Sequence, residues 1–566
     1  MTRSKVESFL KQYDLRLDAV EQYFAIFRLE EDEILAGGGL QGDVIKCVAV
    51  KEELREERLF NMLVSHLMSQ AMTNGIYSVK VYTKPQNLNI FLSLGFKLIA
   101  QSPHALFMEN SLSELDKYKH YLSEKREAAD STSGNGLIIM NANPFTKGHR
   151  YLVEQASAKV KYLFVIVVKE NKSLYDYKYR LAMVTQGCAD LNNVSVLEGS
   201  DYQISAATFP TYFLKQVTDA TDEHILLDLD VCIRHIIPTL GITRRFVGSE
   251  PTDALTARYN ELMHKTLPMN GVEVIEIPRL ESMGKAISAS RVRNDADLSM
   301  VYPTSVPYVI GVMATQSLLQ ELDTNPKPGL IDKTDDGAHN DMNYALMRRS
   351  ISSLDPWMVE FARMGYRNEL PATEQVTAQG KEAEKDMLQA TNGINTHKGA
   401  LFALGLTAIA AANSYYNSQT ITAGELQRGI IELSKQIPRT DNTHGAEVRE
   451  KYGIKGALDM AQEGYSLLFN DWLPYYKRCH SDEYADIKLL LRIITTLYDN
   501  NIYYRRGEAL AEEVRRRATE LLEDFSIEKT MEMNEWMIKE NLSPGGSADM
   551  MALTFFIDQL LKNENN

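Results

Sequence analysis

Cysteine is scarce in this sequence. The 566 residues include only four cysteines, Cys47, Cys188, Cys232 and Cys479, and no two of them form a Cys-x-x-Cys pair. This spacing favours neither a zinc ribbon nor a disulfide framework. We therefore expect reduced thiols, most of them buried.

The sequence also lacks a long apolar run and an excess of basic residues. No segment approaches the ~20 apolar residues of a membrane-spanning helix, and the charged segment Met1–Gln22 is unlike a secretory signal peptide. The formal net charge is -15, which argues against a nucleic-acid coat or a binder of anionic membranes. We expect a cytoplasmic protein with no nucleic-acid or membrane partner.

The length and the order of the predicted elements indicate several domains. A chain of 566 residues is too long for one hydrophobic core, so we expect two to four domains. Residues 1–130 mix strands and helices, and residues 136–308 alternate them, which predicts an α/β region with a parallel sheet. Helical patterns dominate residues 311–566 and predict an all-α domain. We expect a hinge within residues 110–135 and a boundary at Val301–Pro307.

Periodicity locates the individual elements. We predict helices at Leu54–Asn74 and Asn89–Leu94, and a strongly apolar one around Leu401–Ala412. The predicted strands are Asp43–Val50, Val79–Thr83, Leu137–Met140, Tyr162–Val168, Val194–Leu197, Arg245–Val247 and Val272–Ile277.

A polar turn follows the first strand of the predicted parallel sheet. It covers Asn141–His149 and reads Asn-Ala-Asn-Pro-Phe-Thr-Lys-Gly-His. The start of a helix presents unpaired N–H groups and the positive end of the helix dipole, which favours phosphate. Asn143 and Thr146 are short donors at this turn, and Gly148 lets the backbone come close. His149 can donate to a phosphate oxygen as charge builds in the transition state.

A second hydroxyl- and arginine-rich turn lies near the end of the α/β region. Ile287–Arg293 reads Ile-Ser-Ala-Ser-Arg-Val-Arg, so the hydroxyls of Ser288 and Ser290 precede Arg291 and Arg293 at an expected helix start. This pattern suits a second anion site. Each turn alone also fits an ordinary helix cap, whereas the two together at the ends of one α/β region indicate ATP-dependent nucleotidyl transfer.

These turns resemble the HxGH-type nucleotidylyltransferase superfamily, with Thr146 at the position of the first histidine. Within it, Gly248–Pro251 and Tyr259–Asn260 resemble the citrate lyase ligase family, and the likeness covers roughly residues 1–308. The resemblance implies that ATP and acetate form acetyl-adenylate, whose acetyl group passes to the prosthetic-group thiol of the citrate lyase acyl carrier protein. It also implies that the phosphates are held by His149, Ser288, Ser290 and Arg293, with Arg180 and Arg291 as further candidates, and that Gly248 and Glu250 lie near the adenosine.

Residues 20–110 resemble the GNAT acetyltransferase fold through Val48–Leu67, Asn87 and Leu94–Phe96. In that fold a glycine-rich loop binds the pyrophosphate of coenzyme A through backbone N–H groups. The matching segment here, Leu54–Arg58, has no glycine and two acidic residues. We therefore interpret the module as degenerate, either recognising the arm of the carrier protein or serving as a scaffold.

Polar loops rich in glycine, aspartate and histidine interrupt the helical region, and such loops are where chemistry is expected. We expect Lys327, Lys398, Arg505 and Arg506 to receive a triphosphate, and His339, His397 and His444 to transfer protons. Mg²⁺ with a phosphate substrate needs one or two carboxylates, and the candidates are Asp332, Asp341 and Asp549.

These loops resemble the triphosphoribosyl-dephospho-coenzyme A synthase family across most of residues 312–560. The resemblance rests on Pro-Lys-Pro-Gly-Leu, Gly-Ala-His-Asn-Asp-Met, Asn-Thr-His-Lys-Gly and Ser-Pro-Gly-Gly-Ser-Ala-Asp. It implies that ATP is joined to dephospho-coenzyme A with release of adenine, and we expect His339 and Asp341 to take part in catalysis. Lys455–Asp459 departs from the family pattern, which leaves the local substrate contacts open.

The leading hypothesis is a bifunctional enzyme of citrate lyase maturation. One alternative is an adenylyltransferase of cofactor biosynthesis with an attached helical module. Another is that the helical half only docks the carrier protein and has no catalytic role.

Overall fold

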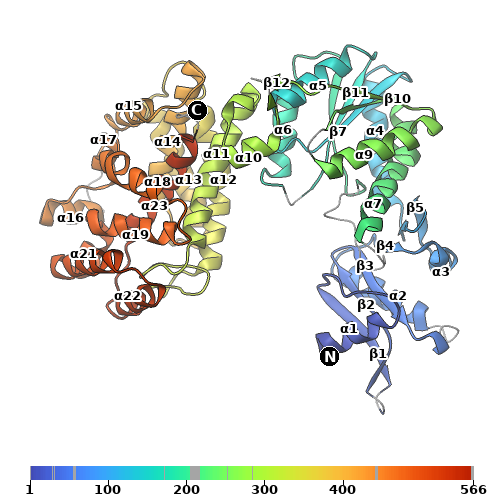
Figure 1. Cartoon of the computed structure of the whole chain (residues 1–566), viewed down its shortest axis with the longest axis horizontal. Coiled ribbons are helices and arrows are strands. Elements are labelled where there is room, and N and C mark those ends of the chain that lie inside the picture. The colour runs from blue at the N-terminus through green and yellow to red at the C-terminus, as the bar shows by residue number, and fades with distance from the viewer. Residues whose placement is uncertain are drawn as a thin grey trace. The chain divides into compact units, whose positions relative to one another are not determined.

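The computed structural model describes residues 2–28, 30, 32–54, 59–170, 173–203, 217–250, 253–282, 285–439 and 444–562. The chain forms two compact units, Met1–Ile287 and Ser288–Asn566 (Figure 1). Each unit is described by itself.

The first unit begins with a mixed six-stranded sheet of order β1-β2-β3-β4-β6-β5. β3 and β4 pair in parallel, and the other neighbours are antiparallel. The predicted strands and the helix predicted at Asn89–Leu94 are found within one residue of their expected bounds. The helix predicted at Leu54–Asn74 is found from Leu59 to Thr73, and residues 55–58 lie outside the described residues. The elements are α1 (Arg3–Lys11), β1 (Gln22–Arg28), β2 (Glu33–Gln41), β3 (Val44–Val50), α2 (Leu59–Thr73), β4 (Lys80–Thr83), α3 (Leu88–Ser93), β5 (Lys97–Gln101) and β6 (Leu106–Glu109).

A five-stranded parallel sheet follows, of order β11-β10-β7-β8-β9. The predicted parallel sheet is thus confirmed, and so is each of its five strands. The strands are β7 (Asn135–Met140), β8 (Leu163–Val167), β9 (Val194–Glu198), β10 (Ile242–Gly248) and β11 (Glu273–Ile277), and a small hairpin of β12 (Glu281–Ser282) and β13 (Lys285–Ala286) comes after them.

Helices cover both faces of the parallel sheet (Figure 1). One face packs against α4 (Ser113–Ala128), α7 (Val217–Val231), α8 (Ile237–Leu240) and α9 (Ala254–Thr266), whose apolar side chains share one core with the strands. α5 (Lys147–Ser157) and α6 (Tyr177–Gly187) contact the strands as well. This is the layered arrangement that alternating strands and helices produce.

Residues 110–135, where we expected a hinge, are mostly helix α4. Leu115 of this helix is buried in the core beside the mixed sheet, and Leu122 is buried in the core of the parallel sheet. The segment that follows is held as well, because the Asn135 side chain donates to the Leu240 carbonyl over 2.7 Å. Most of the stretch is therefore a packed connection between the two sheets.

A buried carboxylate joins the two sheets of the first unit. Glu109, at the end of β6, accepts hydrogen bonds from the hydroxyls of Tyr202 (2.8 Å) and Ser78 (2.6 Å). Burial raises the pKa of Glu109, and these two donors counteract the rise. The ring of Tyr202 also packs beside Phe107.

The second unit is helical, and no strand occurs in its described residues, 288–439 and 444–562. The all-α prediction is confirmed, including the apolar helix predicted around Leu401–Ala412. The helices are α10 (Ala289–Asp295), α11 (Val306–Asp323), α12 (Tyr344–Gly365), α13 (Thr373–Ala390), α14 (Lys398–Ser418), α15 (Ala423–Ser434), α16 (His444–Tyr452), α17 (Ala457–Gln462), α18 (Leu473–Cys479), α19 (Ala485–Thr496), α20 (Asn500–Arg506), α21 (Glu508–Glu523), α22 (Ile527–Lys539) and α23 (Gly545–Leu560).

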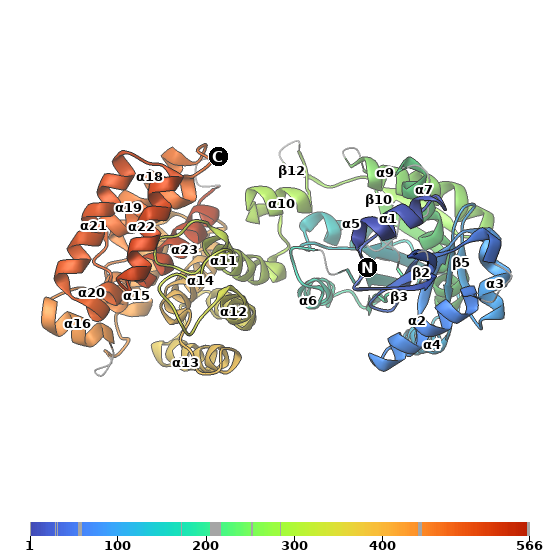
Figure 2. The ribbon, with the colours of Figure 1, turned by 90° about the horizontal axis from the view of Figure 1, so that it is seen from below.

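The core of the helical unit is built from α11, α14 and α23, which pack against one another (Figure 2). Glycine permits the closest helix crossings. A Cβ on Gly311 would lie 2.5 Å from the Val359 backbone, and one on Gly365 would lie 2.1 Å from the Ile409 carbonyl oxygen. Across the described part of the chain, no helix is long and apolar enough to cross a membrane.

Along the chain, the division between the two compact units falls between Ile287 and Ser288, before the proline-containing stretch Val301–Pro307. The residues just after Ser288 already pack with the helices, since the Tyr415 hydroxyl of α14 donates to the Leu298 carbonyl over 2.8 Å.

Replacing Tyr202 with phenylalanine tests the junction between the sheets. Loss of the hydroxyl leaves the buried Glu109 carboxylate short of a donor, so Tyr202→Phe should lower the free energy of unfolding of the first unit by about 1–3 kcal/mol. Tyr77→Phe is the matched control, because Tyr77 is 71% exposed. Urea unfolding followed by circular dichroism measures both variants. Equal midpoints would show that the junction does not depend on this contact.

Candidate active sites

The first candidate site lies where the strand order of the parallel sheet reverses. β7 is flanked by β8 on one side and β10 on the other. Ligands of open α/β sheets bind outside the carboxyl ends of the strands at such a point. The loops there are Asn141–His149 after β7 and Gly248–Glu250 after β10, which are two of the segments predicted from the sequence.

Thr146 and His149 form a capping box at the start of α5. The Thr146 hydroxyl accepts from the His149 N–H (3.3 Å), and the His149 Nδ1 accepts from the Thr146 N–H (3.1 Å). Because Nδ1 is an acceptor, the ring proton is on Nε2. This tautomer can donate a hydrogen bond to a phosphate oxygen. Thr146, predicted as a phosphate donor, is itself buried as the cap of the helix.

Gly148, in the first turn of α5, lies next to the chain that leads into the second motif. A Cβ on Gly148 would lie 3.4 Å from the Ile287 side chain and 3.5 Å from its carbonyl oxygen. Ser288 is the next residue in the chain. The first unit therefore brings the start of the second motif to the start of α5 at Ile287.

The second motif is arranged locally as the sequence predicts. Ser288 is the N-cap of α10, and its hydroxyl accepts from the Ser290 N–H (3.2 Å). The Ser290 hydroxyl accepts from Arg293 Nη2 (3.0 Å). Arg291 faces Asp297 (3.4 Å), and its Nη1 is buried without a hydrogen-bond partner among the described residues.

A partly buried ion pair links the loop after β10 to the segment after β11. Glu250 pairs with Arg279 and also accepts from the Asp253 N–H (3.0 Å). Arg279 donates to the Ser249 carbonyl (2.8 Å), and Asn260 donates to the Gly248 carbonyl (3.1 Å). Sequence reasoning missed Arg279. Its position just after β11, at the carboxyl edge of the same sheet, was the available signal.

Arg180 is fully buried and faces backbone oxygens. Its guanidinium donates to the carbonyls of Tyr175, Asn141, Val168 and Glu170 and to the Asn141 side chain, over 2.6–3.0 Å. These bonds tie together the loops after β7 and β8. Asn143, expected as a phosphate donor, accepts from the Tyr175 N–H (3.1 Å) in the same region. The geometry gives no support to the expected phosphate contact of Arg180 and assigns it to loop positioning.

The second candidate site lies in the helical unit, where charged side chains are buried together. Lys327 pairs with Glu321 of α11, and both are buried. The Lys327 N–H donates to Asp332 Oδ2 (3.2 Å). The other oxygen of Asp332 accepts from the N–H groups of Thr334 (2.8 Å) and Asp335 (3.0 Å), so this carboxylate holds the turn closed.

Asp499 and Asp549 accept hydrogen bonds from helix starts. Asp499 is the N-cap of α20 and also accepts from the N–H of Ser547 (2.7 Å) at the start of α23. Asp549 accepts from the N–H of Ala400 near the start of α14 and lies against Gly399, where a Cβ would come within 2.0 Å of its carboxylate. Burial, and then the charges of Asp499 and Glu321, hold the pKa of Asp549 far above its usual range.

Two histidines of the helical unit are held in the neutral state. His397 is buried with its Nδ1 2.7 Å from the Ser350 hydroxyl, and its Nε2 has no partner among the described residues. Burial, assisted by the charge of Lys327, lowers the pKa of His397 to about 3. His339 Nε2 lies 2.8 Å from the Ser543 hydroxyl, and burial, followed by Arg505, lowers its pKa.

The structure does not gather every candidate of the helical unit. Asp341 is 64% exposed and lies 4.0 Å from His339, while Lys398 pairs with Glu384 and Arg506 with Glu540. In the described ranges, no three His, Cys, Asp or Glu side chains are grouped to hold a metal ion. Asp332, Asp341 and Asp549 therefore do not form a three-ligand centre. The side chain of His444 lies outside the described residues.

Two family models match the chain in succession. Residues 135–301 match the citrate lyase ligase C-terminal domain, and residues 307–566 match ATP:dephospho-CoA triphosphoribosyl transferase.

Curated relatives divide in the same way. The [citrate [pro-3S]-lyase] ligase of Haemophilus influenzae is 41% identical over 298 residues, which are 51% of this chain and 88% of the relative. The ligase of Escherichia coli is 37% identical over 310 residues, 53% of this chain and 87% of the relative. A probable 2-(5''-triphosphoribosyl)-3'-dephosphocoenzyme-A synthase of Pseudomonas putida is 31% identical over 264 residues, 44% of this chain and 94% of the relative.

The two family matches define an enzyme with two parts that uses ATP. The chain belongs to the citrate lyase ligase family through its first part and to the triphosphoribosyl-dephospho-coenzyme A synthase family through its second.

Arg180→Met tests the positioning role of this arginine. The substitution leaves several buried carbonyls without a donor, each costing about 1–3 kcal/mol, so the first unit should lose about 3 kcal/mol or more of stability in urea unfolding. Arg234→Met, at a more exposed arginine paired with Asp230, is the control and should change stability by about 1 kcal/mol at most. If the Arg180→Met variant is as stable as the wild type but binds ATP more weakly, the guanidinium of Arg180 contacts a phosphate and does not position the loops.

His397 gives a prediction about pH. Its pKa is about 3 in the folded chain and 6.5 in the unfolded chain. Below pH 6.5 the unfolded chain therefore binds the additional proton, and stability falls as the pH decreases toward 3. Near pH 5.5 this histidine should reduce the stability of the helical unit by about 1 kcal/mol relative to pH 7.5.

The measurement is urea unfolding at pH 7.5 and pH 5.5 for the wild type and for His397→Asn, whose side-chain amide can still meet Ser350. The variant should lose less stability on acidification than the wild type. The same pH slope in both proteins would show that His397 does not titrate in this range.

Proposed function

We propose that this bifunctional citrate lyase maturation enzyme carries out two ATP-dependent reactions. The first part forms acetyl-adenylate and pyrophosphate from ATP and acetate, then transfers the acetyl group to the prosthetic-group thiol of the citrate lyase acyl carrier protein and releases AMP. The second part forms 2'-(5''-triphosphoribosyl)-3'-dephospho-CoA from ATP and dephospho-CoA and releases adenine. The observation that carries the proposal is the presence of both families on one chain.

The proposed domain limits are residues 1–130 for the GNAT-like module, 136–308 for the ligase domain and 311–566 for the synthase domain. We further propose that the protein works in the cytoplasm.

In the proposed ligase reaction, an acetate oxygen attacks the α-phosphorus of ATP and pyrophosphate leaves. His149 donates from Nε2 to a phosphate oxygen, and donors of this kind are worth most where charge develops. Ser288, Ser290, Arg291 and Arg293 receive the remaining phosphate oxygens. Gly248 leaves space for the adenosine, since a Cβ there would contact nothing within 4 Å, and the Glu250–Arg279 pair fixes the adjoining loop.

In the proposed synthase reaction, the 2′-hydroxyl of dephospho-CoA attacks the anomeric carbon of the ATP ribose, and the bond to adenine breaks. Asp549 keeps a proton because its pKa is raised, so it suits protonation of the departing adenine. The hydroxyl proton passes to a neutral base, for which His339 is the candidate, because His397, with a pKa of about 3, is too weak a base near neutral pH. The buried Lys327 forms an ion pair with Glu321 and so compensates its charge in this cluster.

The site residues also fit a magnesium ion that arrives with the ATP phosphates. Such an ion keeps several waters and takes one or two carboxylates. Asp341 is exposed and open to this role, whereas both oxygens of Asp332 accept hydrogen bonds. Bound there, Mg²⁺ would neutralise phosphate charge.

The two activities can be separated on the full-length protein. His149→Asn should reduce acetate-dependent pyrophosphate release about 100-fold or more while adenine release stays unchanged. Asp549→Asn should do the reverse, and the amide preserves the size of a carboxyl that is already neutral in the folded chain. His120→Asn, at an exposed histidine of α4, is the control for both assays.

Hydroxylamine trapping identifies the ligase intermediate, because it converts an acyl-adenylate into a hydroxamate. Formation of a stable dinucleotide would identify an adenylyltransferase of cofactor biosynthesis. Absence of adenine release from ATP and dephospho-CoA would exclude the synthase reaction.

A further inference from the structure

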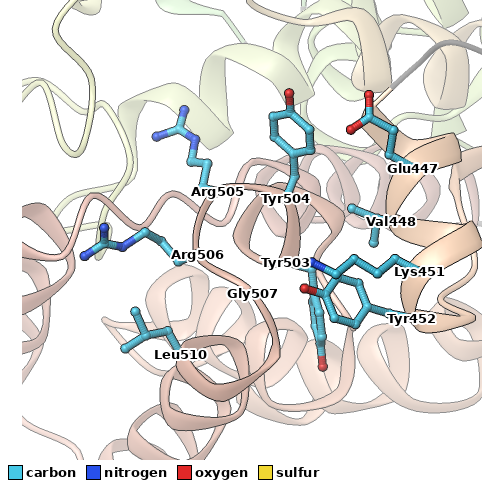
Figure 3. Close-up of a pocket in the computed structure, with 10 residues that line it drawn as sticks. All are labelled: Glu447, Val448, Lys451, Tyr452, Tyr503, Tyr504, Arg505, Arg506, Gly507 and Leu510. Atoms are coloured by element: carbon cyan, nitrogen blue, oxygen red, sulfur yellow. The ribbon is translucent and has the colours of Figure 1, made fainter.

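A cavity of about 560 Å³ opens in the helical unit between α16 and the junction of α20 with α21 (Figure 3). This volume lies in the range of small-molecule sites. Glu447, Val448, Lys451 and Tyr452 line it from α16, and Tyr503, Tyr504, Arg505, Arg506, Gly507 and Leu510 line it from the other side.

The lining is positively charged although the chain is acidic. The lining contains three cationic residues, Lys451, Arg505 and Arg506, and one carboxylate, Glu447, while the whole chain has a formal net charge of -15. Arg506 pairs with Glu540 outside the lining. Among the residues that the structure describes, Arg505 donates to two neutral partners, the Ala338 carbonyl (3.2 Å) and the Asn541 side chain (3.3 Å). Charge of this kind in a cavity is suited to a phosphate chain.

Tyrosine rings form the rest of the wall. Tyr503 is buried and anchored by its hydroxyl to Glu512 (2.8 Å), and Tyr452 meets it edge to face with ring centres 5.4 Å apart. Tyr504 is 43% exposed at the cavity. Gly507 has a φ of +79°, in the left-handed region. A Cβ added to Gly507 would lie 3.4 Å from the Tyr452 hydroxyl oxygen. An aromatic base can stack on such rings without a specific hydrogen-bond pattern.

The cavity is linked to both His339 and the buried carboxylates of the second candidate site. Arg505 binds the carbonyl of Ala338, the residue before His339. Arg505 and Arg506 also end α20, whose other end is capped by the buried Asp499. One short helix therefore connects the cationic cavity with the buried carboxylates.

We propose that this cavity binds an adenine nucleotide, with its phosphate chain on Lys451, Arg505 and Arg506 and its purine against the tyrosines. The assignment rests on the proposed synthase function, which has two such substrates, ATP and dephospho-CoA. Both combine a purine with a phosphate chain, which is the chemistry of the lining.

Hydrogen–deuterium exchange on the full-length Asp549→Asn variant tests this site without turnover. Because exchange is read peptide by peptide, ATP bound in the ligase domain does not interfere. We expect slower exchange in peptides from α16 and from Asn500–Leu510 with ATP or with dephospho-CoA. Protection by ATP alone assigns the site to the ribosyl donor, and protection by dephospho-CoA alone assigns it to the acceptor.

Two results would overturn the proposal. One is unchanged exchange in these peptides with either nucleotide. The other is protection by inorganic triphosphate as strong as that by the nucleotides, which would leave the purine without a role.

Charge reversal provides a second readout. Lys451→Glu should lower the affinity for the nucleotide that slows exchange by about tenfold or more. Lys435→Glu, at an exposed lysine paired with Glu432, should leave this affinity unchanged. An unchanged affinity in Lys451→Glu would contradict nucleotide binding in this cavity. Protection without adenine release in the wild type would instead contradict the synthase reaction and leave the binding site standing.

Discussion

The unpaired N–H groups at helix starts are the constraint on which both candidate sites depend. Every helix begins with N–H groups that lack a partner within the helix. In α5 the Thr146 cap and His149 meet part of this requirement, and the ring of His149 is oriented as a result. In the helical unit the same requirement is met by carboxylates, since Asp499 serves the starts of α20 and α23 and Asp549 serves that of α14.

This arrangement explains how charged groups are buried at the sites. An isolated buried charge is strongly unfavourable, and it persists only when partners compensate it. Asp499 accepts hydrogen bonds from several N–H groups, and Lys327 pairs with Glu321. Arg180 donates to several backbone carbonyls. Burial, followed by the charges of its acidic neighbours Asp499 and Glu321, raises the pKa of Asp549. The compensating partners thus differ from one buried group to the next.

The fold could be predicted well because its signals are local. Short apolar strands alternating with helices define a parallel sheet, and each predicted strand from Leu137–Met140 to Val272–Ile277 is present. Within residues 110–135, where a hinge was expected, Leu115 and Leu122 pack into two different cores. A charged segment with few apolar residues gives little indication of such packing.

The sequence alone determined the families, the architecture and the residue types at both sites, because these depend on short motifs and on periodicity. Only the tertiary structure decided what individual side chains contact. It showed Arg180 facing carbonyls, brought Arg279 to Glu250, and surrounded His397 closely enough to keep it neutral. It also formed the cavity of Lys451 and Arg505 from helices that are separated in the sequence. Burial and the partners of a charge depend on residues distant in the chain, and no local pattern specifies them.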